Sequence, residues 1–163
     1  MEIAIRNAQA EDFPGVCRIM EEVHGLHRRN RPDIYREFDR QGFQAHFEEL
    51  LADSAWALRV AQSGEEILGM AITVYRQTRN AVLQPRLVAW MEDLAVREEF
   101  QGKGVGRALF QDARQQAASR GADAMELMVW GFNGSVGQFY EKMGLVVKSR
   151  ILELPLRKEG RDG

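Results

Sequence analysis

The chain has 163 residues, of which 45% are hydrophobic and 28% are charged, and its formal net charge is −2. This length and composition are typical of one globular domain, which excludes a disordered, collagen-like or fibrous protein. The near balance of 22 Lys and Arg against 24 Asp and Glu excludes the overall basic field expected of a nucleic-acid-binding protein.

The single cysteine, Cys17, excludes an intrachain disulfide and a Cys-rich zinc site, as expected in a reducing compartment. Residues 1–6 lack the long apolar stretch of a secretion signal, and no run of about 18 apolar residues occurs elsewhere in the sequence. We therefore expect a cytoplasmic protein without a membrane or nucleic-acid partner.

The N-terminal third of the sequence predicts one strand and two helices. Residues 2–6 alternate polar and apolar side chains as a half-buried strand does, and residues 7–12 supply helix-capping side chains. Residues 27–35 contain Pro32 and are predicted to form a loop between the two helices. The apolar stripes of the helices are Val16, Ile19, Met20 and Val23 in the first, and Phe43, Phe47, Leu50 and Leu51 in the second.

The middle of the sequence predicts strands. Residues 56–62 and 67–75 form a hairpin across a turn at 63–66. A polar stretch at 76–84 then precedes a strand at 87–96.

The C-terminal half alternates between helix and strand, and Gly121 and Gly144 stand where helices are expected to end. The order predicts an α/β fold with one mixed sheet, in a single domain of residues 1–156 with a flexible tail at 157–163. The elements of this half are a glycine-rich loop up to Gly106, a helix carrying Leu109, Phe110, Ala113 and Ala117, a strand at 124–130, a helix at 135–143 and strands within 145–156.

The sequence Gln-Gly-Lys-Gly-Val-Gly at 101–106 lies between a predicted strand and a predicted helix. Glycines there let backbone N–H groups converge, and the helix N-terminus adds partial positive charge, so a pyrophosphate fits. The spacing fails the dinucleotide fingerprint at Arg107, and no nucleotide-triphosphate loop occurs. The alternative is a connection that binds no ligand.

Several motifs together resemble the GNAT family of N-acetyltransferases. Residues 101–106 match the family pattern Arg/Gln-x-x-Gly-x-Gly/Ala, and Leu-Ala-Val at 94–96 precedes them. Asn133 and the sequence Phe-Tyr-Glu-Lys-Met-Gly-Leu at 139–145 nearly match the later Asn…Phe-Tyr-Glu-Lys-x-Gly-Phe pattern. The resemblance implies a twisted, mostly antiparallel central sheet flanked by about four helices.

The sequence departs from the family pattern at a few positions. Gln101 replaces the commoner Arg, Leu145 replaces Phe, and Val136 and Gly137 stand where Ala and a bulky aliphatic residue are usual. Glycine inside a helix is less favourable than alanine by about 1 kcal/mol, which predicts a slightly loose last helix.

The resemblance implies that acetyl-CoA is bound as the acyl donor. No metal site is expected from the residues themselves, because His24 and His27 have only Cys17 and His46 as further soft ligands and no acidic motif completes a site. The resemblance places the pyrophosphate at the glycine turn and the pantetheine along the backbone of the preceding strand. The cofactor-binding residues that it implies are Leu94, Ala95, Val96, Gln101, Gly102, Lys103, Gly104, Val105, Gly106, Arg107, Asn133 and Tyr140.

Acetyl transfer to an amine requires a group that takes the proton of the ammonium. Glu92 is the first candidate base, and Asp93 is the second. Strand alternation predicts that the two carboxylates lie on opposite faces, with Glu92 on the face of Leu94 and Val96. Glu92 either accepts the proton or only attracts a cationic substrate, and the alternative is a solvent-facing strand residue.

Tyr140 matches the family tyrosine that protonates the departing thiolate, and a phenol of pKa near 10 suits this role. The alternative for Tyr140 is a core aromatic residue, and Asn133 at the helix start is also a candidate N-cap. Cys17 is predicted to be packing rather than a nucleophile. Tyr35 is a weaker candidate for the border of the acceptor cleft.

We expect an enzyme that transfers acetyl from acetyl-CoA to a primary amine of a small cationic molecule, by direct attack in a ternary complex. The Met-Glu-Asp sequence at 91–93 resembles that of polyamine acetyltransferases. The alternative is a catalytically silent module of the same fold that binds acyl-CoA, and a nicotinamide-dependent enzyme is disfavoured. By analogy with the family, the expected partner is a second copy of the chain in a homodimer.

Overall fold

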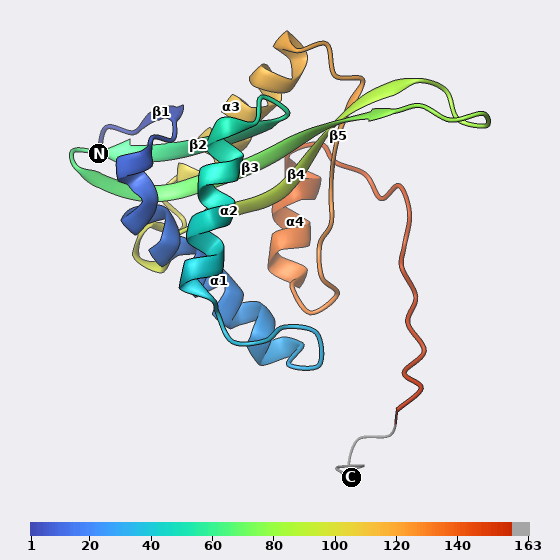
Figure 1. Cartoon of the computed structure of the whole chain (residues 1–163), viewed down its shortest axis with the longest axis horizontal. Helices are drawn as coiled ribbons and strands as arrows, with labels where there is room; N and C mark the ends of the chain where they lie inside the picture. Colours follow the sequence, from blue (N-terminus) through green and yellow to red (C-terminus); the bar gives the residue numbers. More distant parts are fainter. Residues whose placement is uncertain (158–163) are drawn as a thin grey trace. The chain divides into compact units, whose positions relative to one another are not determined.

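The computed structural model describes residues 1–157, and Figure 1 traces them through a sheet and its helices. Short 3₁₀ turns at Ala10–Asp12 and Glu98–Phe100 accompany the main elements. The strands are β1 (Ala4–Asn7), β2 (Trp56–Ser63), β3 (Glu66–Thr78), β4 (Arg86–Val96) and β5 (Ala124–Leu127), and the helices are α1 (Phe13–Asn30), α2 (Arg40–Ala52), α3 (Val105–Ser119) and α4 (Gly134–Lys142).

The described residues divide into two compact units. The first unit, Met1–Met128, holds the whole sheet together with α1, α2 and α3. The second unit begins at Val129 and holds α4. No helix within residues 1–157 has both the length and the apolar character needed to cross a membrane.

The sheet has the strand order β1-β2-β3-β4-β5. The first four strands pair antiparallel, and β5 pairs parallel with β4 through residues 88–91. The expected mixed, mostly antiparallel sheet of an α/β fold is therefore confirmed.

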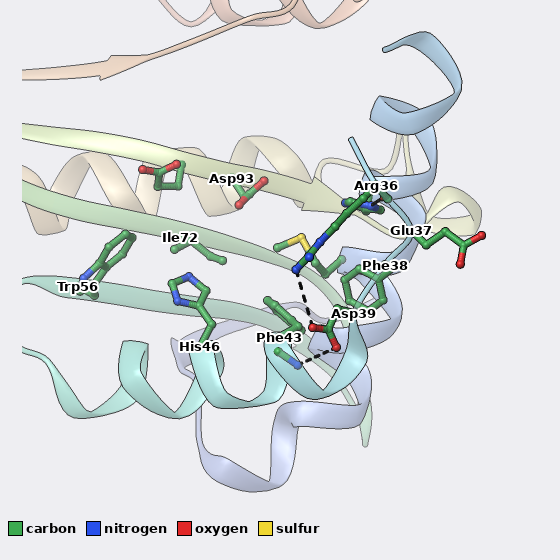
Figure 2. Close-up of a pocket in the computed structure, with 13 residues that line it drawn as sticks. Arg36, Glu37, Phe38, Asp39, Phe43, His46, Trp56, Ile72 and Asp93 are labelled. Atoms are coloured by element: carbon green, nitrogen blue, oxygen red, sulfur yellow. Dashed lines mark hydrogen bonds and ion pairs between the residues drawn. The ribbon is translucent and has the colours of Figure 1, made fainter. Parts of the chain in front are cut away.

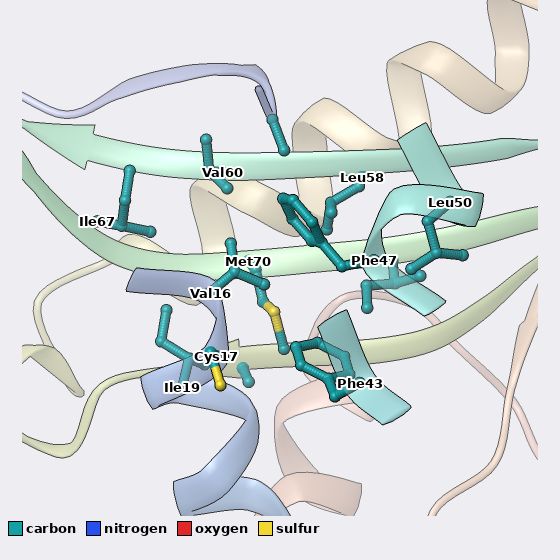
Figure 3. Close-up of a cluster of buried hydrophobic side chains, with 13 residues drawn as sticks. Val16, Cys17, Ile19, Phe43, Phe47, Leu50, Leu58, Val60, Ile67 and Met70 are labelled. Atoms are coloured by element: carbon teal, nitrogen blue, oxygen red, sulfur yellow. The ribbon is translucent and has the colours of Figure 1, made fainter. Parts of the chain in front are cut away.

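The main core lies between the sheet and the pair α1 and α2 (Figure 3). Val16, Cys17 and Ile19 from α1 and Phe47 from α2 are almost completely buried against the Met70 face of the sheet. Truncating a buried aromatic such as Phe47 to Ala costs about 3–5 kcal/mol of stability. The apolar stripes predicted from the sequence form this core except at Leu51, which is exposed, and Cys17 is part of its packing, as predicted.

The opposite face of the sheet is covered by α3. Gly69 on β3 faces this helix, because a Cβ built there lies 3.0 Å from Leu109 Cδ1 and 2.8 Å from the Ala95 carbonyl oxygen. Any side chain at this position displaces the helix, so glycine permits the close approach. Arg59 on β2 adds a half-buried ion pair to Asp112 of α3 at 2.7 Å.

The predicted boundaries of α1 and of β3 are wrong. Residues 27–30 continue α1, because Pro32 lies beyond the last helical residue and a proline there does not disturb the helix. β3 extends to Thr78 and pairs with β4 as far as Arg86, so part of the polar stretch at 76–84 is strand. Figure 1 shows this hairpin reaching beyond the other strands.

The predicted strands within 145–156 are also wrong, and β5 ends at Leu127 rather than at residue 130. An alternating apolar pattern produces a strand only where a neighbouring backbone supplies hydrogen bonds. Residues 145–156 have no such partner within their own unit, because the described residues of that unit include no strand. Of the predicted tail at 157–163, residues 158–163 lie outside the described residues.

Candidate active site

A β-bulge interrupts the pairing of β3 with β4 at the two candidate acids. Ile72 is paired with Asp93 and Thr73 with Met91, so Glu92 is the extra residue of β4. A bulge bends the strand and redirects the side chains next to it.

The bulge places both acids at one cavity. Ile72 belongs to the core cluster of α1 and α2, and Asp93 lies opposite it on that face. Glu92 also lines the cavity. Regular pairing resumes after the bulge, where Leu94 is paired with Ala71. The prediction that Glu92 and Asp93 lie on opposite faces is therefore wrong, because strand alternation does not continue through an inserted residue.

The cavity has a volume of about 560 Å³, within the usual range of small-molecule sites. Side chains from α1, α2, β2, β3, β4 and the segment before α2 line it, as Figure 2 shows. Its lining residues are Met20, His24, Arg36, Glu37, Phe38, Asp39, Gly42, Phe43, His46, Trp56, Ile72, Glu92 and Asp93.

Asp93 is the acid in the more desolvated position. The protein around the cavity screens its carboxylate from bulk water, while part of the side chain faces the cavity. Burial, with a smaller contribution from the Glu92 charge, raises the pKa of Asp93 to about 7. A carboxylate with this pKa exchanges protons near neutral pH, as a general base must.

Glu92 has a different environment. Its carboxylate accepts a hydrogen bond from Arg76 on β3 at 2.9 Å, and 38% of its side chain is exposed. The Arg76 guanidinium also lies over the Trp90 ring at 5.0 Å. The negative charge of Glu92 is thus already paired, whereas Asp93 has no ion pair or hydrogen bond of its carboxylate within residues 1–157.

The segment between α1 and α2 forms one wall of the cavity. The His24 Nε2–H donates to the Arg36 carbonyl oxygen at 2.6 Å, and the His24 ring packs against Phe38. Tyr35 stacks on His27 at 5.1 Å between ring centroids, so it supports the segment rather than lining the cavity. Burial, with the His24 charge, lowers the pKa of His27.

One edge of β4 is open after the bulge. The parallel pairing with β5 ends at Met91 and Leu127, while residues 94–96 keep their antiparallel pairing with β3 on the other side. In the described part of the chain, no strand pairs with this second edge of residues 92–96. Apart from the Val96 carbonyl oxygen, which accepts a hydrogen bond from the Gln101 side chain, the backbone N–H and C=O groups of this edge are available to an extended ligand such as the predicted pantetheine.

The predicted glycine turn has the expected conformation. Gly102 has φ +74° and Gly104 has φ +86°, and a left-handed backbone of this kind favours glycine. Gly104 is the N-cap of α3 and has no side chain that could accept a hydrogen bond from the helix. The first backbone N–H groups of α3 therefore have no partner within the helix. The exposed cationic side chains of Lys103 and Arg107 flank the turn.

Sequence reasoning missed Arg97, a buried cation just before the turn. Its guanidinium pairs with Glu99 and, at 3.6 Å, with Glu66 at the start of β3, and it lies over the Phe100 ring. The Gln101 Nε2 group donates to the Val96 carbonyl oxygen at 3.1 Å. These contacts fix the path from β4 to the turn.

The second unit carries two further predicted residues. Asn133 is the N-cap of α4, but its side chain makes no capping hydrogen bond. Tyr140 is buried in α4 and packs edge-on against Phe139 at 5.2 Å between ring centroids. Gly144 has φ +94° just after the helix, as its predicted role as a helix stop requires.

Comparisons with known proteins agree with this architecture. The chain is 26% identical over 155 residues to the acetyltransferase SG1711 of Sodalis glossinidius, which covers 94% of each chain. A mutant of the BH1408 protein from Bacillus halodurans superposes with a TM-score of 0.86 at 29% identity, over 94% of this chain and 99% of that chain.

The fold is also that of an aminoglycoside N-acetyltransferase, AAC(6')-Iy, solved in complex with CoA. Its TM-score is 0.78 at 16% identity, over 97% of this chain and 95% of that chain. Residues 19–145 match the family model described as the acetyltransferase (GNAT) family. The match extends over most of the chain and includes both the acidic bulge and the glycine turn, and the protein therefore belongs to the acetyltransferase (GNAT) family.

Proposed function

We propose that the protein is an N-acetyltransferase that moves the acetyl group of acetyl-CoA to a primary amine of a small cationic molecule. The observation that carries the proposal is the order in which three features follow one another along β4. An acidic bulge faces a cavity, an open backbone edge follows it, and the edge leads to a glycine turn. Donor and acceptor sites are thus arranged along one strand.

The donor half of the proposal uses mainly backbone groups. The N–H groups at the start of α3 bind the pyrophosphate, with Lys103 and Arg107 as nearby cations. The open edge of residues 94–96 pairs with the amides of pantetheine. Asn133 is a further cofactor contact, and the absence of a capping bond leaves its side chain available.

The acceptor half depends on Asp93. An alkylammonium with a pKa near 10 is neutral in only about one molecule per thousand at pH 7, so a nearby base increases the reactive fraction. We assign the proton to Asp93, because its pKa is near 7 and its carboxylate is unpaired within residues 1–157. Glu92, already paired with Arg76, attracts the cationic acceptor to the mouth of the cavity.

The reaction then follows direct attack in a ternary complex. The ammonium gives one proton to Asp93, and the neutral nitrogen attacks the thioester carbonyl carbon, so that a C–N bond forms. The C–S bond breaks, and the thiolate takes a proton from the Tyr140 phenol, which regains one from the nitrogen of the intermediate. The role of Tyr140 is supported by its match to the family motif.

The test is thiol release from acetyl-CoA by the purified protein, with polyamines, aminoglycosides, amino acids, arylalkylamines and short peptides as acceptors. A reaction without acceptor is the control. Acceptor-dependent release with an acetylated amine as the product supports the proposal. Binding of acetyl-CoA without release, across all acceptors, contradicts it and favours a module that binds acyl-CoA without turnover.

A further inference from the structure

Resting on the proposed function, we infer that the acceptor is a monoamine: one ammonium group attached to an aromatic or bulky apolar body. The cavity at the β4 bulge offers one unpaired carboxylate and several aromatic walls, which do not suit a polycation. This inference narrows the small cationic acceptor to one chemical class.

Two of the four cavity carboxylates are already occupied. Asp39 is the N-cap of α2, accepts a hydrogen bond from the Gly42 N–H at 3.0 Å and lies 3.9 Å from the Arg36 guanidinium. Glu37 forms an ion pair with Arg28 at 3.3 Å, and Figure 2 shows its carboxylate turned away from the other labelled residues. Neither carboxylate therefore provides a free charge for a ligand.

The remaining two are the adjacent acids of the bulge. Glu92 is paired with Arg76 at 2.9 Å. Asp93 is the one cavity carboxylate without a cationic partner among residues 1–157. A polyamine or aminoglycoside buries several ammonium groups on binding, and each unpaired buried charge is strongly unfavourable. One free carboxylate therefore selects for one ammonium.

The other walls are mainly apolar and aromatic. Trp56 from β2 and His46 from α2 meet edge-on at 6.0 Å, and Phe38 and Phe43 lie 5.8 Å apart between ring centroids. Figure 2 shows Ile72 between Trp56 and Asp93 along the cavity. Such walls bind a ring by burying apolar area and by offset or edge-on ring contacts.

The first experiment compares three acceptors at saturating acetyl-CoA: 2-phenylethylamine, spermidine and ethylamine. We expect kcat/KM for 2-phenylethylamine to exceed that for spermidine at least tenfold, and that for ethylamine at least a hundredfold. Turnover of spermidine equal to or better than that of 2-phenylethylamine overturns the inference and leaves the proposed function intact.

A binding measurement decides the inference even if the proposed function fails. Calorimetric titration of each amine into the protein saturated with CoA needs no chemical step. Tighter binding of 2-phenylethylamine than of spermidine supports the monoamine class. Equal or tighter binding of spermidine contradicts it, whatever the turnover.

Variants of Trp56 test the aromatic wall. Trp56→Leu is expected to lower kcat/KM for 2-phenylethylamine about tenfold and to change that for ethylamine less than twofold, while Trp56→Phe retains most of the preference. His46→Gln, at an exposed position of α2 that lines the cavity but lies outside the core cluster, serves as a second variant that leaves the core unchanged. We expect His46→Gln to lower kcat/KM for 2-phenylethylamine about threefold relative to kcat/KM for ethylamine. An equal loss for both amines, or no loss in either variant, contradicts the inference.

Discussion

The glycine turn and the acceptor cavity lie along the same strand and are built in different ways. The turn at 101–106 is contiguous in sequence and presents backbone N–H groups, held by two left-handed glycines. The cavity is assembled from side chains of six segments, and its free charge comes from Asp93. The turn is therefore one local group of backbone donors, while the cavity combines side chains that are far apart in the sequence. A substitution at the turn is expected to act by disturbing the left-handed backbone of a glycine. A substitution at the cavity is expected to act by changing the charge or the shape that the acceptor meets.

Asp93→Asn gives the largest expected effect and tests the cavity side of the comparison. The amide retains the shape and removes the base, so kcat falls by about 10²–10⁴-fold, the usual contribution of a general base. The dissociation constant of acetyl-CoA stays within twofold, because the turn is untouched. Steady-state rates and calorimetry measure the two quantities. Glu48→Gln, an exposed acid on α2, is the matched control, and an unchanged kcat in Asp93→Asn removes this residue from the mechanism.

Tyr140→Phe is expected to lower kcat about 100-fold, because the thiolate loses its proton donor. The affinity for acetyl-CoA is expected to stay within about threefold, because the ring is retained. Phe139→Leu is the control for the edge-on packing of the two rings. Equal rates for Tyr140→Phe and the unaltered protein exclude the tyrosine from the reaction.

The same Asp93→Asn variant predicts a pH-dependent stability difference. Folding raises the pKa of Asp93 from 3.8 to about 7, so the native state favours the protonated acid. Its stabilising contribution is complete below about pH 4 and is lost as the pH rises through 7. The asparagine side chain of the variant does not titrate, so the variant should be more stable than the unaltered protein at pH 8, by about 2–4 kcal/mol, and not at pH 4.

Urea denaturation at the two pH values measures this difference. Several other charged or titratable groups face Asp93 from the surrounding elements and are present in both proteins, so the difference between the two proteins reports on Asp93. A constant difference between pH 4 and pH 8 contradicts the assigned burial of Asp93. These groups are His24 on α1, Arg36 and Asp39 before α2, His46 on α2 and Glu92 on β4.

Gly104→Ala tests the turn side of the comparison. A side chain at φ +86° costs about 1–2 kcal/mol, which is expected to weaken acetyl-CoA binding about tenfold through distortion of the α3 N-terminus. The KM for the amine stays unchanged. Gly64→Ala is a matched control, because Gly64 also has φ +58° and open space around it but lies in the β2–β3 turn. If both variants weaken acetyl-CoA binding equally, the effect is one of stability and not of recognition.

The two sites also differ in how far the sequence predicts them. The turn is local: its glycines, the strand before it and the helix after it are adjacent, so its conformation follows from residue types. The stripes of α1 and α2 are predictable for the same reason, because helical periodicity fixes which side chains face the sheet.

The cavity was not predictable because it depends on non-local pairing. The inserted residue at Glu92 appears only when β3 and β4 are paired, and it brings the two acids, which alternation places on opposite faces, to the same cavity. Glu92 and Asp93 then differ because of residues that are distant in the sequence. Arg76 forms an ion pair with Glu92, whereas the cavity walls bury Asp93 and raise its pKa. The wrong strands at 145–156 show the same limit, because a strand needs a neighbour that alternation does not reveal.

Glu92→Gln gives the smallest expected effect and separates the two acids. The substitution removes a half-exposed charge that Arg76 already pairs, so we expect the KM for a cationic amine to rise about threefold and kcat to stay within twofold. The released Arg76 charge repels the incoming ammonium, and the effect should shrink as salt screens it. Rates at low and high ionic strength measure this. A loss of kcat as large as that of Asp93→Asn would reverse the assignment, because the base would then be the paired acid of the bulge and not the buried one.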